Sequence, residues 1–205
     1  RRYIPQLHLS PDTLQAFEPR PRGAPEVSVH DLWFAYNGQP VLRGIDLEIG
    51  HGEFVAIMGR NGSGKTTLLK QLVGLLQPHR GQVAIHGLDT RHTSTEQLIE
   101  FVGYVPQNPN SLLFADSVRA EIAFTRHSHG LEPDAPAGLL ESLALERHAE
   151  HYPRDLSVGE RQRVALAAIL AAEPSIILLD EPTRGVDYAQ KQALVRYLQQ
   201  QRAQG

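Results

Sequence analysis

The chain has 205 residues, a formal net charge of −3 and 41% hydrophobic residues, which suits one large domain or two small ones. The slightly acidic balance gives no electrostatic reason to expect nucleic-acid binding. The absence of cysteine excludes disulfides and thiolate metal sites, and no apolar stretch approaches the roughly 18 residues that cross a membrane.

The first 25 residues are expected to form an interdomain linker or a tail. Residues 1–25 contain prolines at positions 5, 11, 19, 21 and 25, and such a density of proline favours an extended connection between domains. The only methionine is Met58, and residues 199–205 form a polar stretch without a stop signal before the final glycine. Both features favour an internal piece of a longer protein.

A β-hairpin is the first regular element that the sequence predicts. Residues 27–34 read as a strand, the pair Asn37-Gly38 is a strong turn signal, and residues 41–49 form a second strand region. The next apolar run, Phe54–Met58, is typical of a buried parallel strand.

Residues 59–66 carry the most informative motif of the chain. They read Gly-Arg-Asn-Gly-Ser-Gly-Lys-Thr, which fits G-x-x-x-x-G-K-[ST] at every fixed position. The predicted strand before the motif and a predicted helix over residues 66–73 supply the context that a chance glycine-rich turn would lack. The sequence therefore predicts a loop that binds the phosphates of a nucleotide.

Phosphate binding requires a particular residue type at each fixed position of this loop. Gly59, Gly62 and Gly64 allow turns that a Cβ would block, and they let backbone N–H groups approach the phosphates. Lys65 is expected to reach the β- and γ-phosphates, and the hydroxyl of Thr66 is expected to bind Mg²⁺. The positive end of the helix dipole points at the same anion.

The remaining helices and strands are predicted from the spacing of apolar residues and from the glycines and prolines that interrupt regular structure. In chain order they are a strand at 82–85, a helix at 96–100, an extended segment at 101–105, a mostly helical region at 110–151 broken by His129-Gly130, Pro133 and Pro136, and a buried strand at 175–180.

Two acids follow the last apolar strand. Asp180 and Glu181 come directly after Ile176–Leu179, and ligands in open α/β sheets bind at the carboxyl ends of the strands. Asp180 suits the Mg²⁺ shell, directly or through water, and Glu181 suits a general base that acts on water. Alone such a pair often caps a helix, but beside a phosphate loop it favours a catalytic site.

Residues 156–162 supply a third element of the site. Ser157 and Glu160 form an S-x-x-E capping box at the start of a helix that runs to about Ala172. A helix cap is one interpretation of this segment. The other adds an anion site at the same helix N-terminus, which Gly159 would let a phosphate approach closely.

Together these motifs resemble those of ABC-type ATPases over about residues 26–205. The phosphate loop corresponds to the Walker A motif and residues 176–181 to the Walker B strand. Residues 156–162 resemble the signature L-S-G-G-Q, with Val158 in place of its first glycine and Glu160 in place of its glutamine. The resemblance implies an α/β P-loop NTPase fold with a RecA-like, mostly parallel sheet, an N-terminal antiparallel β subdomain and an inserted helical subdomain at about residues 108–160.

The resemblance also assigns catalytic and metal-binding roles. Glu181 and Gln107, the latter in a Q-loop at 104–109, are expected at the catalytic centre. Thr66, Gln107 and Asp180 are expected around Mg²⁺. The nucleotide itself is expected to contact Tyr36, Gly59, Asn61, Gly62, Ser63, Gly64, Lys65, Thr66 and Thr67.

Further roles involve the base and a second domain. Tyr36 is expected to stack on adenine, although an aromatic residue at a strand end also suits the core. Ser157, Gly159 and Glu160 are expected to meet the ATP of a partner domain, and Asp187 in a D-loop at 183–187 is expected to act across the dimer.

Within this family, residues 155–163 and 182–187 resemble the ATPase subunits of energy-coupling-factor importers, which take up vitamins and transition-metal ions through separate membrane subunits. The segment 111–124 fits the same group. Three of its apolar residues suit either a surface for a membrane partner or the core of the helical subdomain: Leu112, Leu113 and Phe114.

One departure concerns histidine. The family carries a switch histidine on a strand after the D-loop helix, and the sequence ends before that strand. The resemblance therefore predicts ATP binding with poor turnover for these residues alone. His148 and His151, near the signature, are predicted to be surface residues.

The predicted function is ATP binding and hydrolysis for an ABC transporter at the cytoplasmic face of the cell membrane. The expected cofactors are ATP and Mg²⁺. The expected partners are a second ABC ATPase domain, in the same chain or another, and integral membrane subunits, with no nucleic acid. The alternatives are a tandem-domain translation factor, a DNA-repair ATPase, and a nucleotide-binding module without activity. The proline-rich residues 1–25 argue against the first, and the lack of cysteine for zinc argues against the second.

Overall fold

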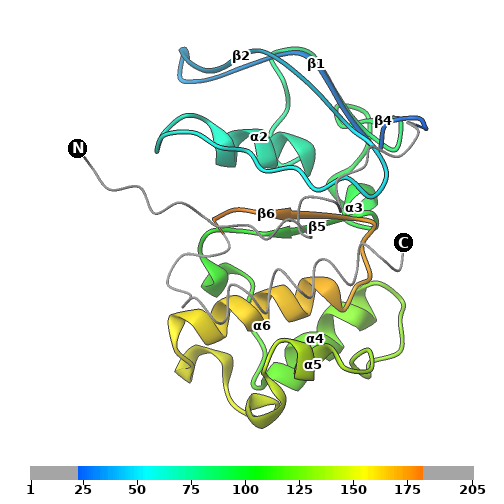
Figure 1. Cartoon of the computed structure of the whole chain (residues 1–205), viewed down its shortest axis with the longest axis vertical. Helices are drawn as coiled ribbons and strands as arrows, with labels where there is room; N and C mark the ends of the chain where they lie inside the picture. The colour runs from blue at the N-terminus through cyan, green and yellow to red at the C-terminus, as the bar shows by residue number, and fades with distance from the viewer. Residues whose placement is uncertain (1–22, 182–205) are drawn as a thin grey trace, which may run out of the picture.

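The computed structural model describes residues 23–181, and an antiparallel sheet forms its first layer (Figure 1). Its strands pair in the order β2-β1-β3-β4. The predicted hairpin is confirmed: Tyr36 pairs with Gln39, and the turn residues Asn37 and Gly38 both have positive φ, 48° and 78°. The strands are β1 (Val27–Tyr36), β2 (Gln39–Ile49), β3 (Arg80–Ile85) and β4 (Leu88–Asp89).

A parallel pair of strands forms the second sheet. β5 (Val102–Val105) lies beside β6 (Ile176–Leu179), and the ladder continues where the N–H of Asp180 donates to the carbonyl of Val105 at 3.0 Å. Both strands were predicted, and their parallel pairing confirms the α/β fold class. The pairing places the residues that follow β5 and β6 at the same edge of the sheet.

Helices cover both faces of this parallel pair (Figure 1). α2 (Lys65–Leu72) lies between the two sheets, and the buried faces of α2 and β1–β3 form one apolar core. α6 (Val158–Leu170) covers the opposite face of the parallel pair. The other helical elements are α3 (Thr95–Leu98), α4 (Val118–Ser128), α5 (Leu139–Ser142) and the 3-10 turns η1 (Pro109–Ser111), η2 (Glu146–His148) and η3 (Pro153–Asp155).

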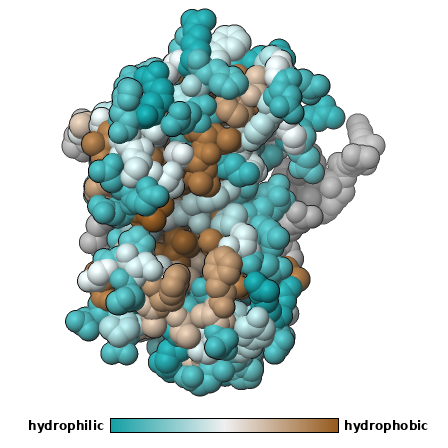
Figure 2. Space-filling view, turned by 180° about the vertical axis from the view of Figure 1, so that it is seen from behind, coloured by the Kyte–Doolittle hydropathy of each residue, from teal (hydrophilic) through white to brown (hydrophobic). Residues whose placement is uncertain are grey.

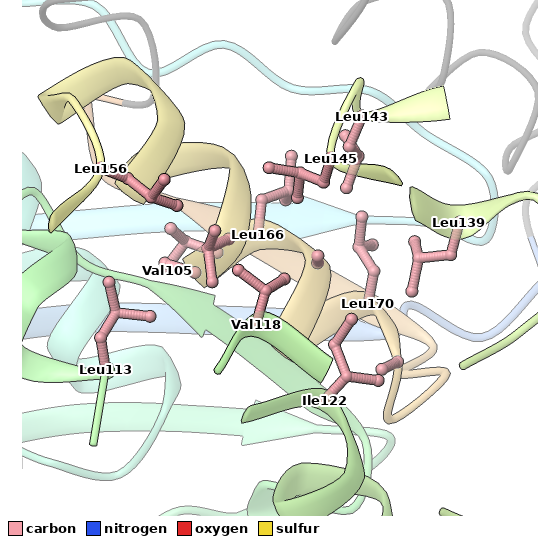
Figure 3. Close-up of a cluster of buried hydrophobic side chains, with 14 residues drawn as sticks. Val105, Leu113, Val118, Ile122, Leu139, Leu143, Leu145, Leu156, Leu166 and Leu170 are labelled. Carbon is pink, nitrogen blue, oxygen red and sulfur yellow. The ribbon is translucent and has the colours of Figure 1, made fainter. Parts of the chain in front are cut away.

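A second core fills the helical half of the molecule (Figure 3). Leu166 and Leu170 of α6 pack against Val118 and Ile122 of α4, with Val105 of β5 beneath them. All five side chains are buried. Across residues 23–181, no helix has the length and apolar character needed to cross a bilayer.

The predicted buried strand at Phe54–Met58 is wrong for the described structure. This run has no strand pairing; Phe54 is 55% exposed and Met58 is 88% exposed. A cavity of about 1000 Å³ is lined by Phe54–Ile57 and by Ile176–Leu179. Within residues 23–181 β6 pairs with β5 alone, so its other edge has no strand partner, and residues 54–57 line the cavity beside β6 without hydrogen-bonding to that edge. Apolar side chains also gather in the middle of the face seen in Figure 2.

The residues 112–114 were predicted to form either a surface for a membrane partner or part of the core. One of them is buried in the core and another is exposed. Leu113 is 1% exposed and belongs to the helical core, whereas Phe114 is 69% exposed. Glu121 of α4 fixes this loop, because one of its carboxylate oxygens accepts the N–H groups of Phe114 and Ala115, each at 2.8 Å. The sequence did not single out Glu121, whose side chain is almost fully buried.

We expect Glu121→Ala to lower the free energy of unfolding by about 3 kcal/mol, because two amide groups lose their buried acceptor. Urea denaturation followed by circular dichroism measures the change. Glu141→Ala removes an exposed carboxylate from α5 and is the control, with an expected change within about 0.5 kcal/mol. Equal destabilisation by the two variants would contradict this role of Glu121.

Candidate nucleotide-binding and catalytic site

The phosphate loop has two glycines at which a side chain would be strained or crowded. Gly64, which precedes the helix, has a φ of 93°, in the left-handed region. A Cβ added to Gly59 would lie 2.6 Å from Oγ of Ser63. Nζ of Lys65 donates to the carbonyl oxygens of Gly59 and Arg60 at 3.1 and 3.2 Å. The ammonium group is therefore folded back over the loop, and a methyl group at Gly59 would collide with the hydroxyl of Ser63.

We expect Gly59→Ala to weaken ATP binding about tenfold, because the new methyl group displaces the Ser63 hydroxyl within the phosphate loop. Titration with a fluorescent ATP analogue measures the affinity. Gly130→Ala is the control, since it changes a glycine in the turn after α4, where φ is 68° and no atom lies within 4 Å of the added Cβ. A comparable loss in both variants would show a general folding defect instead.

A hydrogen bond joins the phosphate loop to the end of β6. Oγ1 of Thr66 donates to Oδ1 of Asp180 at 3.0 Å, across 114 positions of sequence. Asp180 is 3% exposed, and the hydroxyl of Tyr104 donates to its other oxygen at 3.4 Å. Burial, and after it the nearby charge of Asp180, raises the pKa of Tyr104 to about 12. The phenol therefore stays protonated at neutral pH as a donor to Asp180.

These groups fit Mg²⁺ by their chemistry. A hydroxyl and a carboxylate are hard oxygen ligands, and Mg²⁺ in nucleotide sites takes only one or two protein oxygens besides phosphates and water. Thr66 and Asp180 form such a pair at the start of α2. The donor set is thus suited to a nucleotide-bound Mg²⁺, and the Mg²⁺-binding role expected of both residues stays a prediction.

A second hydrogen bond joins the two predicted catalytic residues. Nε2 of Gln107 donates to Oε2 of Glu181 at 2.7 Å. Gln107 follows β5 and Glu181 follows β6, so the parallel pairing brings them to one edge. Glu181 has a φ of 50°, which is unusual for a residue other than glycine. The carboxylate of Glu181 is exposed, so water can reach it.

The predicted adenine-stacking residue lies beside the loop. Tyr36 is 44% exposed and packs edge-on against Phe34, with ring centroids 4.9 Å apart. The hairpin that carries it also approaches the loop, because side chains of Val41 and Leu42 lie about 3 Å from where a Cβ of Gly64 would be. Tyr36 is thus not a core residue in this structure, and its stacking role stays a prediction.

The other loop residues differ in exposure. Asn61 and Ser63 are exposed, whereas Thr67 is 7% exposed and faces the core from α2. The predicted D-loop residue Asp187 lies outside the described residues.

The signature segment lies on the far side of the parallel pair from α2 (Figure 1). Its predicted capping box is confirmed: Oγ of Ser157 accepts the N–H of Glu160 at 3.3 Å, and Oε2 of Glu160 accepts the N–H of Ser157 at 2.9 Å. Ser157 is exposed and Gly159 is buried. The fold therefore does not bring these residues to the phosphate loop of the same chain.

Two residues near the signature make contacts that the sequence did not predict. Arg161 donates to the carbonyls of Leu156 and Arg154, at 2.5 and 3.1 Å, and so fixes the turn before α6. His148 was predicted at the surface, but its side chain is only 14% exposed and lies 3.1 Å from Glu160. The prediction was wrong because a turn 12 positions upstream packs against the start of α6. His151 is exposed, as predicted.

Comparison with known proteins decides the family. The sequence model of the family described as ABC transporter matches residues 42–184. The chain belongs to the ABC transporter family. The matched residues include the phosphate loop, the Q-loop, the signature and the Walker B strand, which confirms the resemblance drawn from these motifs.

Relatives of this ABC chain are numerous. A protein of Methanosarcina mazei, described as a candidate ABC transporter ATP-binding protein, is 42% identical over 185 residues, which cover 88% of the chain and 37% of that protein. A Pyrococcus furiosus protein with the same description is 40% identical over 184 residues, which cover 87% of the chain and 70% of that protein. The chain thus spans well under half of the first of these relatives.

Solved structures share the fold of the ABC chain. An ATP-binding subunit of an ABC transporter has a TM-score of 0.78 and 29% identity, and the match covers 87% of the chain and 75% of that structure. The cbiO1 protein of Clostridium perfringens, part of the ABC transporter complex cbiONQ, has a TM-score of 0.75 and 29% identity over 88% of the chain and 76% of that structure. These matches confirm a P-loop NTPase fold of the ABC type.

Proposed function

We propose that this chain binds ATP with Mg²⁺ and hydrolyses it to drive an ABC importer of the energy-coupling-factor type. The hydrogen bond between Thr66 and Asp180 carries the proposal, because it joins a phosphate-binding loop to a buried carboxylate suited to Mg²⁺. In this proposal Lys65 balances phosphate charge, and Thr66 and Asp180 hold the metal ion. Bound Mg²⁺ would neutralise charge that develops on the transferred phosphoryl group.

Glu181 is the proposed general base. Its exposed carboxylate would accept a proton from the attacking water, and the amide of Gln107 would orient that carboxylate through the bond of 2.7 Å. Because a side-chain amide donates but carries no charge, Gln107 can hold Glu181 without removing its basicity.

A second ATPase domain completes the proposed site. Ser157, Gly159 and Glu160 lie away from the phosphate loop of their own chain, so they would meet the ATP bound by a partner domain in a head-to-tail dimer, with Asp187 acting across it. Hydrolysis would then open a closed dimer, and ATP affinity would differ between the two states.

The importer type rests on resemblance and on one surface. The likeness to cbiO1, part of a transporter complex, supports it. Phe114 lies exposed a few residues after Gln107, on a loop that Glu121 holds in place. Such an apolar contact beside the catalytic edge suits a helix of a membrane subunit at the cytoplasmic face of the membrane. A substrate such as a vitamin or metal ion would be chosen by those subunits.

Membrane association of the tagged full-length protein in its native host tests the transporter part. We expect the protein to float with membrane vesicles and to co-purify with a polytopic subunit, and Phe114→Ser to reduce co-purification about tenfold. Phe124→Ser is the control, because Phe124 is 63% exposed on α4. Sedimentation with ribosomes, or no membrane association at all, would overturn the transporter proposal and favour a non-transport ABC ATPase.

A further inference from the structure

Glu160 holds the hydroxyl proton of the signature serine. Oε2 of Glu160 accepts both the N–H and the hydroxyl of Ser157, at 2.9 and 2.7 Å. A phosphate oxygen has only lone pairs to offer at neutral pH, so Ser157 must donate its hydroxyl proton to bind one. The same proton cannot serve both acceptors fully. The carboxylate, which stands where a glutamine is usual in the signature, therefore competes with a phosphate for Ser157.

His148 contacts the other oxygen of this carboxylate. Its Nε2 lies 3.1 Å from Oε1 of Glu160, and both side chains are largely buried, at 14% and 19% exposure. The same Nε2 lies 3.0 Å from Nε of Arg147, which can only donate. Nε2 without a proton accepts from Arg147, and Nε2 with a proton donates to Glu160. Nε2 of His148 thus lies between two partners, one of which requires this nitrogen without a proton and the other with one.

The other groups around this pair are also ionisable. The ring of His151 packs edge-on against His148, with centroids 5.3 Å apart, and Arg163 acts on Glu160 by its charge. The bonds from Ser157, and to a smaller extent the charges of His148 and Arg163, lower the pKa of Glu160. Glu160 therefore stays ionised near neutral pH, and its negative charge is shared between Oε1, which His148 contacts, and Oε2, which Ser157 contacts.

We propose that His148 is a positioning residue for the signature segment, and that a proton on its Nε2 weakens the hold of Glu160 on the Ser157 hydroxyl. A protonated His148 draws the charge of Glu160 toward Oε1 and away from Oε2. Ser157 is then freer to donate to a phosphate, and less negative charge faces that phosphate. The inference rests on the proposed role of the signature toward the ATP of a partner domain.

The predicted consequence is a pH-dependent affinity for ATP in the assembled dimer. In the full-length protein with excess Mg²⁺, the KM for ATP of His148→Gln divided by that of the wild type is expected to change about two- to fivefold between about pH 6 and pH 8. The glutamine amide donates to Glu160 at every pH, so the wild type should be favoured at low pH. Ionisation of ATP itself cancels in this ratio.

Two further variants separate positioning from general stability. Glu160→Gln removes the charge that His148 acts on, so adding His148→Gln to it should produce no further change in the pH profile. His151→Gln is the matched control, because the His151 ring packs against His148, whereas the Glu160 carboxylate bonds to Ser157 and His148, and the pH profile of this variant should follow the wild type.

Parallel profiles for His148→Gln and the wild type, even at a lower overall rate, would overturn the inference, because a merely structural role changes KM or kcat by the same factor at every pH. An undiminished effect of His148→Gln in the Glu160→Gln background would also overturn it. A wild-type protein that neither binds nor hydrolyses ATP would overturn the proposed function, and this inference with it.

Discussion

Replacing Glu181 with glutamine is expected to lower ATP hydrolysis about 100-fold or more while ATP binding is kept. General-base catalysis commonly contributes factors of about 10² to 10⁴, and glutamine cannot take a proton from water. Its size and its contact with Gln107 can be retained, because the new amide still offers an oxygen to the donor Nε2 that now lies 2.7 Å from Glu181. Steady-state phosphate release by the full-length protein measures the rate.

The same variant is expected to accumulate the ATP-bound dimer, since the step that opens the dimer is blocked. Size-exclusion chromatography with Mg²⁺ and ATP should show the dimer for Glu181→Gln and much less of it for the wild type. Glu100→Gln, which changes an exposed carboxylate before β5, is the control for charge alone. A variant that hydrolyses ATP at the wild-type rate would remove Glu181 from its role, and the absence of a dimer would contradict the dimer arrangement.

Local patterns predicted the elements that are stabilised locally. The hairpin over Val27–Ile49 depends on Asn37-Gly38, whose residues tolerate positive φ, and α6 depends on a capping box within four residues. The sequence motifs also named Thr66, Gln107, Asp180 and Glu181, which the fold joins in two hydrogen bonds, although the catalytic and Mg²⁺ roles of these residues stay predictions. The parallel pairing of β5 with β6 explains why Gln107 and Glu181 meet.

Other features depend on neighbours that no local pattern names. The run Phe54–Met58 has the composition of a buried strand, but composition does not show whether a run pairs with a neighbour, and among the described residues this run leaves one edge of β6 unpaired. The burial of Glu121 and of His148 likewise follows from long-range packing. An i, i+3 or i, i+4 rule can find the bond between Ser157 and Glu160, but not the contact of His148 with the same carboxylate.

Replacing Lys65 with alanine is expected to weaken ATP binding about 10- to 100-fold, because charge-assisted hydrogen bonds to phosphate contribute about 1.5–3 kcal/mol. Within residues 23–181 the ammonium bonds only to the carbonyls of Gly59 and Arg60 in its own loop. Its loss should therefore leave the stability of the nucleotide-free protein nearly unchanged. Titration with a fluorescent ATP analogue gives the affinity, and thermal unfolding without nucleotide gives the stability.

Two companion variants identify what the lysine contributes. Lys70→Ala removes a positive charge from the last turn of the same helix, α2, and should leave ATP affinity within about twofold of the wild type. Lys65→Arg keeps the charge but replaces a compact ammonium with a planar guanidinium, which the tight loop around Gly59 should accommodate poorly. Full affinity in Lys65→Arg would mean that charge alone suffices. Full affinity in Lys65→Ala would mean that the backbone N–H groups and the helix dipole hold the phosphates without the lysine, and that the loop binds nucleotide in another way than its motif implies.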